Sequence, residues 1–169
     1  MPWVIPWEDF SKVNNTDLAY IAGFLDGDGS IMLQFHRRDR GKEIFRIKTV
    51  ICFYQDNRYL SEIKWIQQIF NCGYVYTRND RICELRIEGY QRVFDVLMLL
   101  RPYLRLKRKQ AELLIDLIPQ LQRKLVSKQD IVVWIQKMRE LNYFSSQRNT
   151  LENVPVTTDM DKHSVKTEI

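Results

Sequence analysis

The chain has 169 residues, enough for one domain with its own core, and its apolar (45%) and charged (28%) fractions are those of a globular protein. No run of about 18 apolar residues occurs, which excludes a membrane-spanning helix and argues against a membrane partner. The opening residues MPWVIPWEDF lack the basic and then apolar pattern of a secretion signal. No secretion signal is therefore expected, and the localisation stays open among intracellular settings, whether organellar, prokaryotic or archaeal.

The composition also argues against several kinds of metal or disulfide centre. The three cysteines are odd in number and form no CxxC pair, and the two histidines, His36 and His163, are far apart. These counts disfavour a disulfide framework, a zinc ribbon and a histidine-rich nuclease centre. The net charge is +5, and cations cluster in residues 37–48 and in RPYLRLKRK at 101–109, which is consistent with a polyanionic partner.

The chain predicts helices alternating with hairpins. Residues 1–15 are interpreted as an N-terminal extension, 16–144 as the domain and 145–169 as a polar C-terminal tail. Capping signals and apolar spacing predict a first helix from Asn15 or Thr16 to the glycines of DGDG, and then strands 31–38 and 43–55 around a turn at 39–42. A helix at 57–70 and strands 73–78 and 81–88 follow. Three further helices are predicted at 89–100, 102–119 and 129–142. This order predicts an α+β fold: an αββαββα core with a four-stranded antiparallel sheet and extra C-terminal helices.

The predicted strands present two different faces, because alternate side chains point to opposite sides of a sheet. One face carries apolar residues such as Ile31 and Ile51, and the other carries long polar side chains such as Gln34, Lys48 and Arg86. The polar face has two interpretations. It is either a solvated outer surface or a DNA-reading surface, since Gln and Arg bridge base edges and a two-stranded ribbon fits the major groove.

Small residues recur along one side of the first helix. Ala19, Gly23 and Gly27 follow one another at intervals of four residues, with Ala22 beside them. A glycine inside a helix costs about 1 kcal/mol relative to alanine, so close approach of a second backbone is one explanation. The alternative is that Gly23 is incidental and Gly27 merely ends the helix.

Two acids, Asp26 and Asp28, lie where this helix should end. The C-terminal end of a helix is already partly negative, so acids are unfavourable there unless a cation offsets them. Carboxylates and backbone carbonyls are suitable ligands for magnesium. A calcium-binding EF-hand loop that starts at Asp26 does not fit. Its sixth position would be Ile31 where such a loop has Gly, and its twelfth would be Arg37 where such a loop has Glu. A turn without metal remains the alternative.

The segment LAYIAGFLDGDGS resembles the signature helix of the LAGLIDADG homing endonucleases. The resemblance continues through the order of the hairpins, Gln55 at the end of the second strand, GYVY at the third, and LRPYLRLKRKQAELL after the third helix. The chain is most similar to the single-motif branch of this family. The resemblance implies a homodimer, with two signature helices side by side on a dyad and two saddle-shaped sheets along the major groove of a long, nearly palindromic site. It assigns Ala19, Ala22, Gly23 and Asp26 to the dimer interface.

By motif position, the resemblance implies that Asp28 is the metal-binding carboxylate and that Gly27 offers a backbone carbonyl. The expected cofactor is Mg²⁺, with Mn²⁺ or Ca²⁺ as alternative occupants, and Asp26 is expected to be structural. Gln55 and Lys107 would order water and offset charge around the scissile phosphate. Arg58 is the nearest candidate for a basic residue that the family has after this glutamine. Lys107 could instead be one more cation of a solvated basic helix.

The family's DNA-facing positions fall on the polar side of the predicted strands and their turn, and one phosphate-contacting position falls in the tail. The implied DNA-binding residues are Ser30, Met32, Gln34, His36, Arg38, Arg40, Arg46, Lys48, Tyr76, Arg78, Glu84, Arg86 and Arg148.

The resemblance predicts metal-dependent hydrolysis of one phosphodiester in each strand of double-stranded DNA. Two other functions remain open for the same fold: an RNA maturase that assists splicing of an intron RNA, and a DNA-binding protein that does not cleave. A magnesium-independent transcriptional regulator is a further alternative, which the magnesium and salt dependence of binding would distinguish.

Overall fold

The structure, a computed structural model, describes residues 13–38 and 44–142, without the side chains of residues 36–38, 44–46 and 128. Its elements in chain order are α1 (Asn15–Asp28), β1 (Gly29–Arg38), β2 (Ile44–Asp56), the short 3-10 helix η2 (Asn57–Tyr59), α2 (Leu60–Phe70), β3 (Tyr74–Thr77), β4 (Ile82–Glu88), α3 (Tyr90–Leu100), α4 (Arg108–Gln122) and α5 (Lys128–Leu141). The predicted α+β fold, with its αββαββα core and further C-terminal helices, is confirmed. The expected N-terminal extension and C-terminal tail fall almost entirely outside the described residues.

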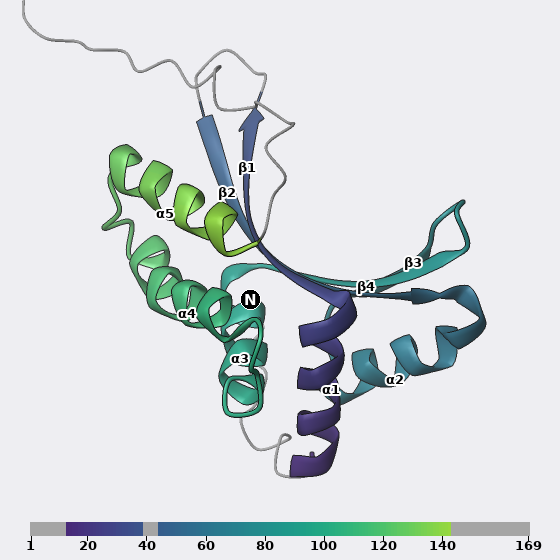
Figure 1. The fold of residues 1–169 in the computed structure, drawn as a ribbon. Coiled ribbons are helices and arrows are strands. Elements are labelled where there is room, and N and C mark those ends of the chain that lie inside the picture. The colour runs from purple at the N-terminus through teal and green to yellow at the C-terminus, as the bar shows by residue number, and fades with distance from the viewer. Residues whose placement is uncertain (1–12, 39–43, 143–169) are drawn as a thin grey trace, which may run out of the picture.

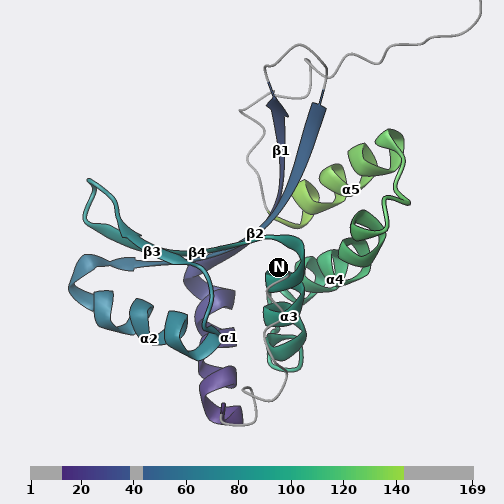
Figure 2. The same ribbon diagram turned by 180° about the vertical axis from the view of Figure 1, so that it is seen from behind.

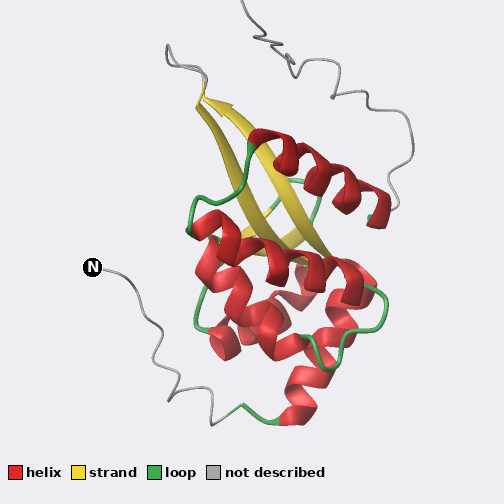
Figure 3. Ribbon diagram, turned by 90° about the vertical axis from the view of Figure 1, so that its left-hand side faces the viewer, coloured by secondary structure: helices red, strands yellow, loops and turns green. Residues whose placement is uncertain are grey.

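The four strands form one antiparallel sheet in the order β1-β2-β4-β3. Figure 1 shows that this sheet is bent, because the β1–β2 hairpin rises away from the plane of β3 and β4. The described helices lie on one side of the bend, as the view from behind in Figure 2 also shows. In Figure 3 the helices stand in front of the strands. The opposite, concave side of the sheet bears no helix of the described chain.

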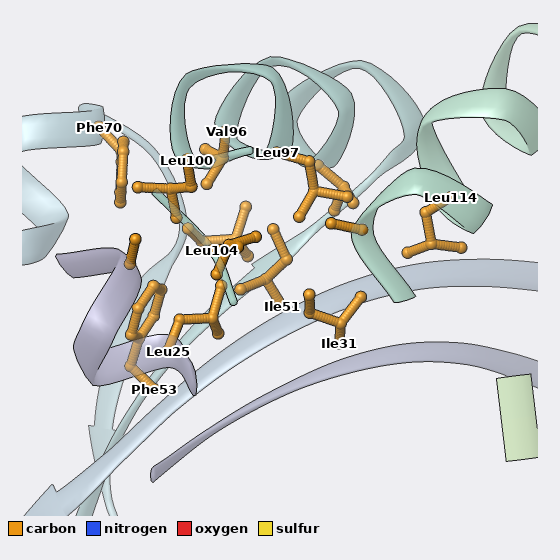
Figure 4. Packing of buried hydrophobic residues seen from close by; sticks show 14 of the residues in the cluster. Leu25, Ile31, Ile51, Phe53, Phe70, Val96, Leu97, Leu100, Leu104 and Leu114 are labelled. Carbon is orange, nitrogen blue, oxygen red and sulfur yellow. The ribbon is translucent and has the colours of Figure 1, made fainter. Parts of the chain in front are cut away.

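The core fills the space between the sheet and the helices. Figure 4 shows Leu25 of α1, Ile51 and Phe53 of β2, and Leu97 and Leu100 of α3 converging there, and all of them are fully buried. Each such side chain contributes about 1.5–3 kcal/mol when it leaves water. This packing joins α1 and α3 to the helical side of the sheet and leaves the polar side chains of the same strands on the concave side.

The first helix begins at Asn15, within the predicted start, although its N-cap lies one residue earlier than expected. The N-cap of α1 is Asn14 instead of Asn15 or Thr16, and its Oδ1 accepts the backbone N–H of Asp17 at 2.7 Å. As predicted, this helix stops within DGDG: Asp28 is its last residue and Gly29, whose backbone is extended (φ −97°, ψ 177°), is its C-cap.

The helix expected to begin at Pro102 begins at Arg108, because the backbone N–H groups just before it are bound to a side chain of α1. It also passes through Pro119, where it was expected to end, and continues to Gln122. Within the described ranges, none of the helices is both long and apolar enough to cross a bilayer.

Gly29 is required by its surroundings at the junction of α1 and β1. A Cβ added there would lie 2.5 Å from Cδ1 and 2.9 Å from both Cα and the carbonyl oxygen of Leu25. We expect Gly29→Ala to lower the free energy of unfolding by about 1–3 kcal/mol, because the preceding helix must shift. Urea unfolding checks this against Ser61→Ala at an exposed position of α2. Equal stability of the two variants would contradict the close packing of this junction.

Candidate active site and nucleic-acid interface

The two acids at the end of α1 have different surroundings. Asp26 is buried, and its carboxylate accepts the backbone N–H groups of Arg105 at 2.7 Å, Leu106 at 3.1 Å and Lys107 at 2.8 Å. Asp28, two residues further along the helix, is exposed. Asp26 therefore fixes a distant segment of the chain, while the carboxylate of Asp28 can accept a ligand from outside.

Lys107 is brought to the same helix end from the segment before α4. Its Nζ donates to the backbone carbonyl of Asp26, and the side chain is half-buried. Burial lowers the pKa of Lys107, and the nearby charges of Asp26 and Asp28 act in the opposite direction. The arrangement places a partly desolvated ammonium group at the end of the helix that carries the exposed carboxylate of Asp28.

Gln55 and Gly27 complete the set of residues expected at this site. Gly29, the first residue of β1, pairs with Phe53 across the sheet, so Gln55 lies two residues beyond that pair, near the end of β2. Its Oε1 accepts the backbone N–H of Asp56 at 2.9 Å. Gly27 is exposed in the last turn of α1. The junction of α1 with the sheet therefore brings Asp28 and Lys107 together and places Gln55 on the adjacent strand.

The donor chemistry at the end of α1 fits a hard divalent cation. Asp28 offers an exposed carboxylate, and Gly27 is exposed in the last turn of the helix. The last backbone carbonyl oxygens of a helix have no partner within it and can bind a cation. Among the described residues, no three side chains of His, Cys, Asp or Glu gather as a metal site. The exposed carboxylate of Asp28 is the acidic side chain that the end of α1 offers to such a cation.

Arg58 lies in η2, directly after the end of β2. Its side chain is 79% exposed, and its Nε lies 2.9 Å from Oδ1 of Asp56. The segment from Gln55 to Tyr59 therefore presents this arginine to solvent in an exposed ion pair.

The concave face of the sheet carries seven of the side chains expected to contact DNA: Ser30, Met32, Gln34, Lys48, Tyr76, Glu84 and Arg86. Arg78 follows the end of β3 and is exposed. The side chains of His36, Arg38 and Arg46, and all of Arg40 and Arg148, lie outside the described residues. Cys52, Tyr54 and Tyr74 share this face, although the sequence did not mark them as binding residues. Each of the three alternates with core residues along its strand, and this alternation is the signal that could have placed them on the concave face.

Ionic contacts cross the concave face between three strands. Nε of Arg86 donates to Glu88 at 2.7 Å, and its Nη2 donates to Oε1 of Gln34 at 3.0 Å. Nζ of Lys48 lies 3.5 Å from Oε2 of Glu88. Burial acts to lower the pKa of Arg86, but the hydrogen bond that Arg86 donates to Glu88 and the nearby negative charge outweigh it, so the pKa is raised. These contacts hold the polar side chains in a fixed arrangement.

Glu84 lies beneath this surface and is only 3% exposed. Its Oε2 accepts the hydroxyl of Tyr76, and its Oε1 accepts the thiol of Cys52 at 3.2 Å. Burial is the largest cause that raises the pKa of Cys52, to about 12, so this thiol stays protonated and donates. Glu84 was expected to contact DNA, but its carboxylate is buried beneath the concave face and bound to neighbouring side chains.

Part of the first helix is open to a second molecule. Ala19 and Gly23 are exposed on α1, but Ala22 is fully buried and Asp26 is 8% exposed, so these two expected interface residues face their own chain. Leu106, which lies within the helix predicted at 102–119, instead precedes α4 and is 75% exposed. The binding of its backbone N–H to Asp26 keeps it out of the helix.

The chain is similar to known DNA endonucleases. A family profile described as LAGLIDADG endonuclease matches residues 21–118. The DNA endonuclease I-CvuI of Chlorella vulgaris is 34% identical over 103 residues, which are 61% of this chain and 64% of that relative. The DNA endonuclease I-CreI of Chlamydomonas reinhardtii is 27% identical over 152 residues, which are 88% of this chain and 93% of that relative.

The fold matches solved structures of the same kind. I-CvuI, crystallised with the I-CreI target in the presence of Mg, has a TM-score of 0.70 at 27% identity, covering 79% of this chain and 86% of that chain. The homing endonuclease I-TnaI shares the fold with a TM-score of 0.64 at 19% identity, covering 76% of this chain and 89% of that chain. The matched profile runs from α1, through both hairpins and Lys107, into α4. The chain therefore belongs to the LAGLIDADG endonuclease family.

Proposed function

We propose that this chain is a site-specific homing endonuclease that cuts both strands of a long, nearly palindromic DNA site as a magnesium-dependent homodimer. The observation that carries the proposal is the end of α1, where Asp28 presents an exposed carboxylate and the half-buried Lys107 donates its ammonium to the backbone carbonyl of Asp26, two residues earlier in the same helix. A protein that only binds DNA or RNA has no need for this pair. Cleavage is therefore favoured over binding alone and over splicing assistance alone.

The concave face of the sheet is the proposed DNA-binding surface. It has the shape of a saddle free of described helices, and it carries Gln34, Lys48 and Arg86. The net charge of +5 favours a polyanion. I-CvuI has been solved in complex with its target in the presence of Ca. By analogy, β1–β2 and β3–β4 would lie along the major groove of the target.

The chain's residues have separate roles in the proposed reaction. The carboxylate of Asp28 and the backbone carbonyl of Gly27 would hold Mg²⁺, which when bound polarises phosphoryl oxygens and lowers the pKa of water. Lys107 would stabilise negative charge that grows on the phosphate, and Asp26 keeps it in place through its backbone N–H. Gln55 would orient water through its side-chain amide.

The exposed glycines of α1 support the proposed dimer. A Cβ added at Gly23 or Gly27 would meet no described atom within 4 Å, so the packing of this chain does not require either glycine. Each glycine costs the helix about 1 kcal/mol relative to alanine, and close approach of a second α1 accounts for that cost. The exposed Leu106 adds apolar surface that a second chain could cover. Two chains would supply the two Asp28 carboxylates needed to cut two strands.

We predict that Asp28→Asn abolishes cleavage, by at least about a hundredfold, because the neutral amide is a poor ligand for a hard cation. The DNA target site is first selected from a randomised library with purified protein. Magnesium is titrated well above 2 mM, the concentration at which I-CvuI held its DNA uncleaved in the crystal. Because Asp28 is exposed, binding of the selected site and the free energy of unfolding should stay unchanged. Full cleavage by this variant in magnesium would refute the assignment.

Asp26→Asn is the matched variant two residues away and should fail for a different reason. An asparagine has one acceptor oxygen in place of two, so at least one backbone N–H of residues 105–107 is left unpaired. We expect the free energy of unfolding to fall by about 1–3 kcal/mol. Denaturant unfolding separates the two variants: Asp26→Asn shifts the midpoint and Asp28→Asn does not. The same midpoint for both would contradict the structural role of Asp26.

Gly23→Leu tests the dimer. The new side chain enters open space in the single chain but would separate two packed helices, so we expect monomers that no longer cleave. Sedimentation velocity of the unaltered protein should give about twice the chain mass of 20.4 kDa. Gln129→Leu, at an exposed position of α5 far from α1, is the control that should stay dimeric. A monomeric wild-type protein on its selected DNA site would contradict this arrangement.

A further inference from the structure

Arg86 is held by neighbouring side chains of the concave face. Its Nε binds Glu88 at 2.7 Å and its Nη2 binds Gln34 at 3.0 Å. Its Nη1 lies 3.5 Å from Glu84 and 3.7 Å from the sulfur of Cys52. The side chain is 19% exposed. Reading a guanine would require Arg86 to give up two of these contacts, since that readout needs two parallel donors.

Glu84 organises the same half of the face from below. Its two carboxylate oxygens receive hydrogen bonds from opposite directions, one from the Tyr76 hydroxyl and one from the Cys52 thiol. A buried carboxylate with these partners is costly to move, because each donor would be left unpaired. Glu84 therefore fixes the direction of the Tyr76 ring.

Tyr74 and Tyr76 supply the exposed aromatic surface of β3. They are 48% and 39% exposed, and their ring centroids lie 6.0 Å apart at an interplanar angle of 26°. The Tyr76 hydroxyl is committed to Glu84, and this hydrogen bond is the largest cause that raises its pKa to about 12. The part of Tyr76 that can meet a ligand is therefore its ring, an apolar surface within a polar face.

We propose that Tyr74 and Tyr76 form a contact surface for the 5-methyl group of thymine in the major groove, and that Glu84 is a positioning residue for Tyr76. Thymine is the base whose major-groove edge carries an apolar methyl group, and apolar side chains recognise it by contact. This inference rests on the proposed binding of double-stranded DNA by the concave face. It names thymine as the base that one part of that surface recognises.

Deoxyuridine tests the inference, because it keeps the hydrogen-bonding edge of thymine and lacks only the methyl group. Each thymine of the selected site is replaced in turn, symmetrically in both half-sites, and binding and cleavage are measured. We expect the wild-type protein to lose about fourfold in affinity per half-site at one or two positions, as the loss of one buried methyl group predicts. Tyr76→Ala should bind the thymine and deoxyuridine sites equally at those positions.

Tyr76→Phe is the matched control, since it keeps the ring and removes the hydroxyl. It should keep the thymine preference, as should Glu84→Gln, whose amide oxygen still accepts the Tyr76 hydroxyl. Glu84→Leu should weaken the preference at the same positions while the salt dependence of binding stays that of the wild-type protein. Circular dichroism identifies any variant that has failed to fold, and the comparison of Tyr76→Ala with Tyr76→Phe does not depend on Glu84.

Two results would overturn the inference. One is a wild-type protein whose affinity does not change with deoxyuridine at any position of a site that it binds and cleaves. The other is a Tyr76→Ala variant that keeps the wild-type thymine preference. Both leave the endonuclease proposal intact. Failure of the wild-type protein to bind or cleave any member of the library in magnesium would refute the endonuclease proposal, and this inference with it.

Discussion

The carboxylate of Asp26 is the contact on which the candidate active site depends. It accepts three successive backbone N–H groups, those of residues 105–107, and so joins the end of α1 to the start of α4 across a long stretch of sequence. Without this anchor, Lys107 would be one cation among several in a basic segment. With it, the ammonium of Lys107 lies at the end of the helix that carries Asp28. A negative charge at a helix C-terminus, locally unfavourable, is stabilised here by donors from another part of the chain.

The first helix joins the chain's own core to two functional surfaces. Leu25 packs under the sheet, Asp28 is exposed directly before the start of β1, and Gly23 is left on open surface. A helix can do this because its side chains point in different directions at intervals of about 100°. The same element thus fixes the relation between the proposed metal ligand, the DNA-binding surface and the proposed partner chain. A shift of α1 would disturb all three.

The sequence predicted the elements, their order and the two faces of the sheet, because apolar periodicity reports which side of each element is buried. The resemblance pointed to Asp28, Gln55 and Lys107, which the structure places around one junction. The segment just before α4 could not be predicted locally, since the N–H groups of residues 105–107 bind a carboxylate about 80 residues away. Glu84 was also missed as a buried residue, because strand alternation gives the direction of a side chain and not its depth.

The shared carboxylate of Glu84 has a consequence for how binding specificity can change. Cys52 of β2, Tyr76 of β3 and Arg86 of β4 all contact it, so a substitution at one of them alters the hydrogen-bonding needs of the others. Effects of changes at these positions should not add, as is usual within one hydrogen-bonded network. A lineage that acquires a new target would pass more readily through paired substitutions than through single ones. In this part of the surface, the network and not the single residue is the unit of evolutionary change.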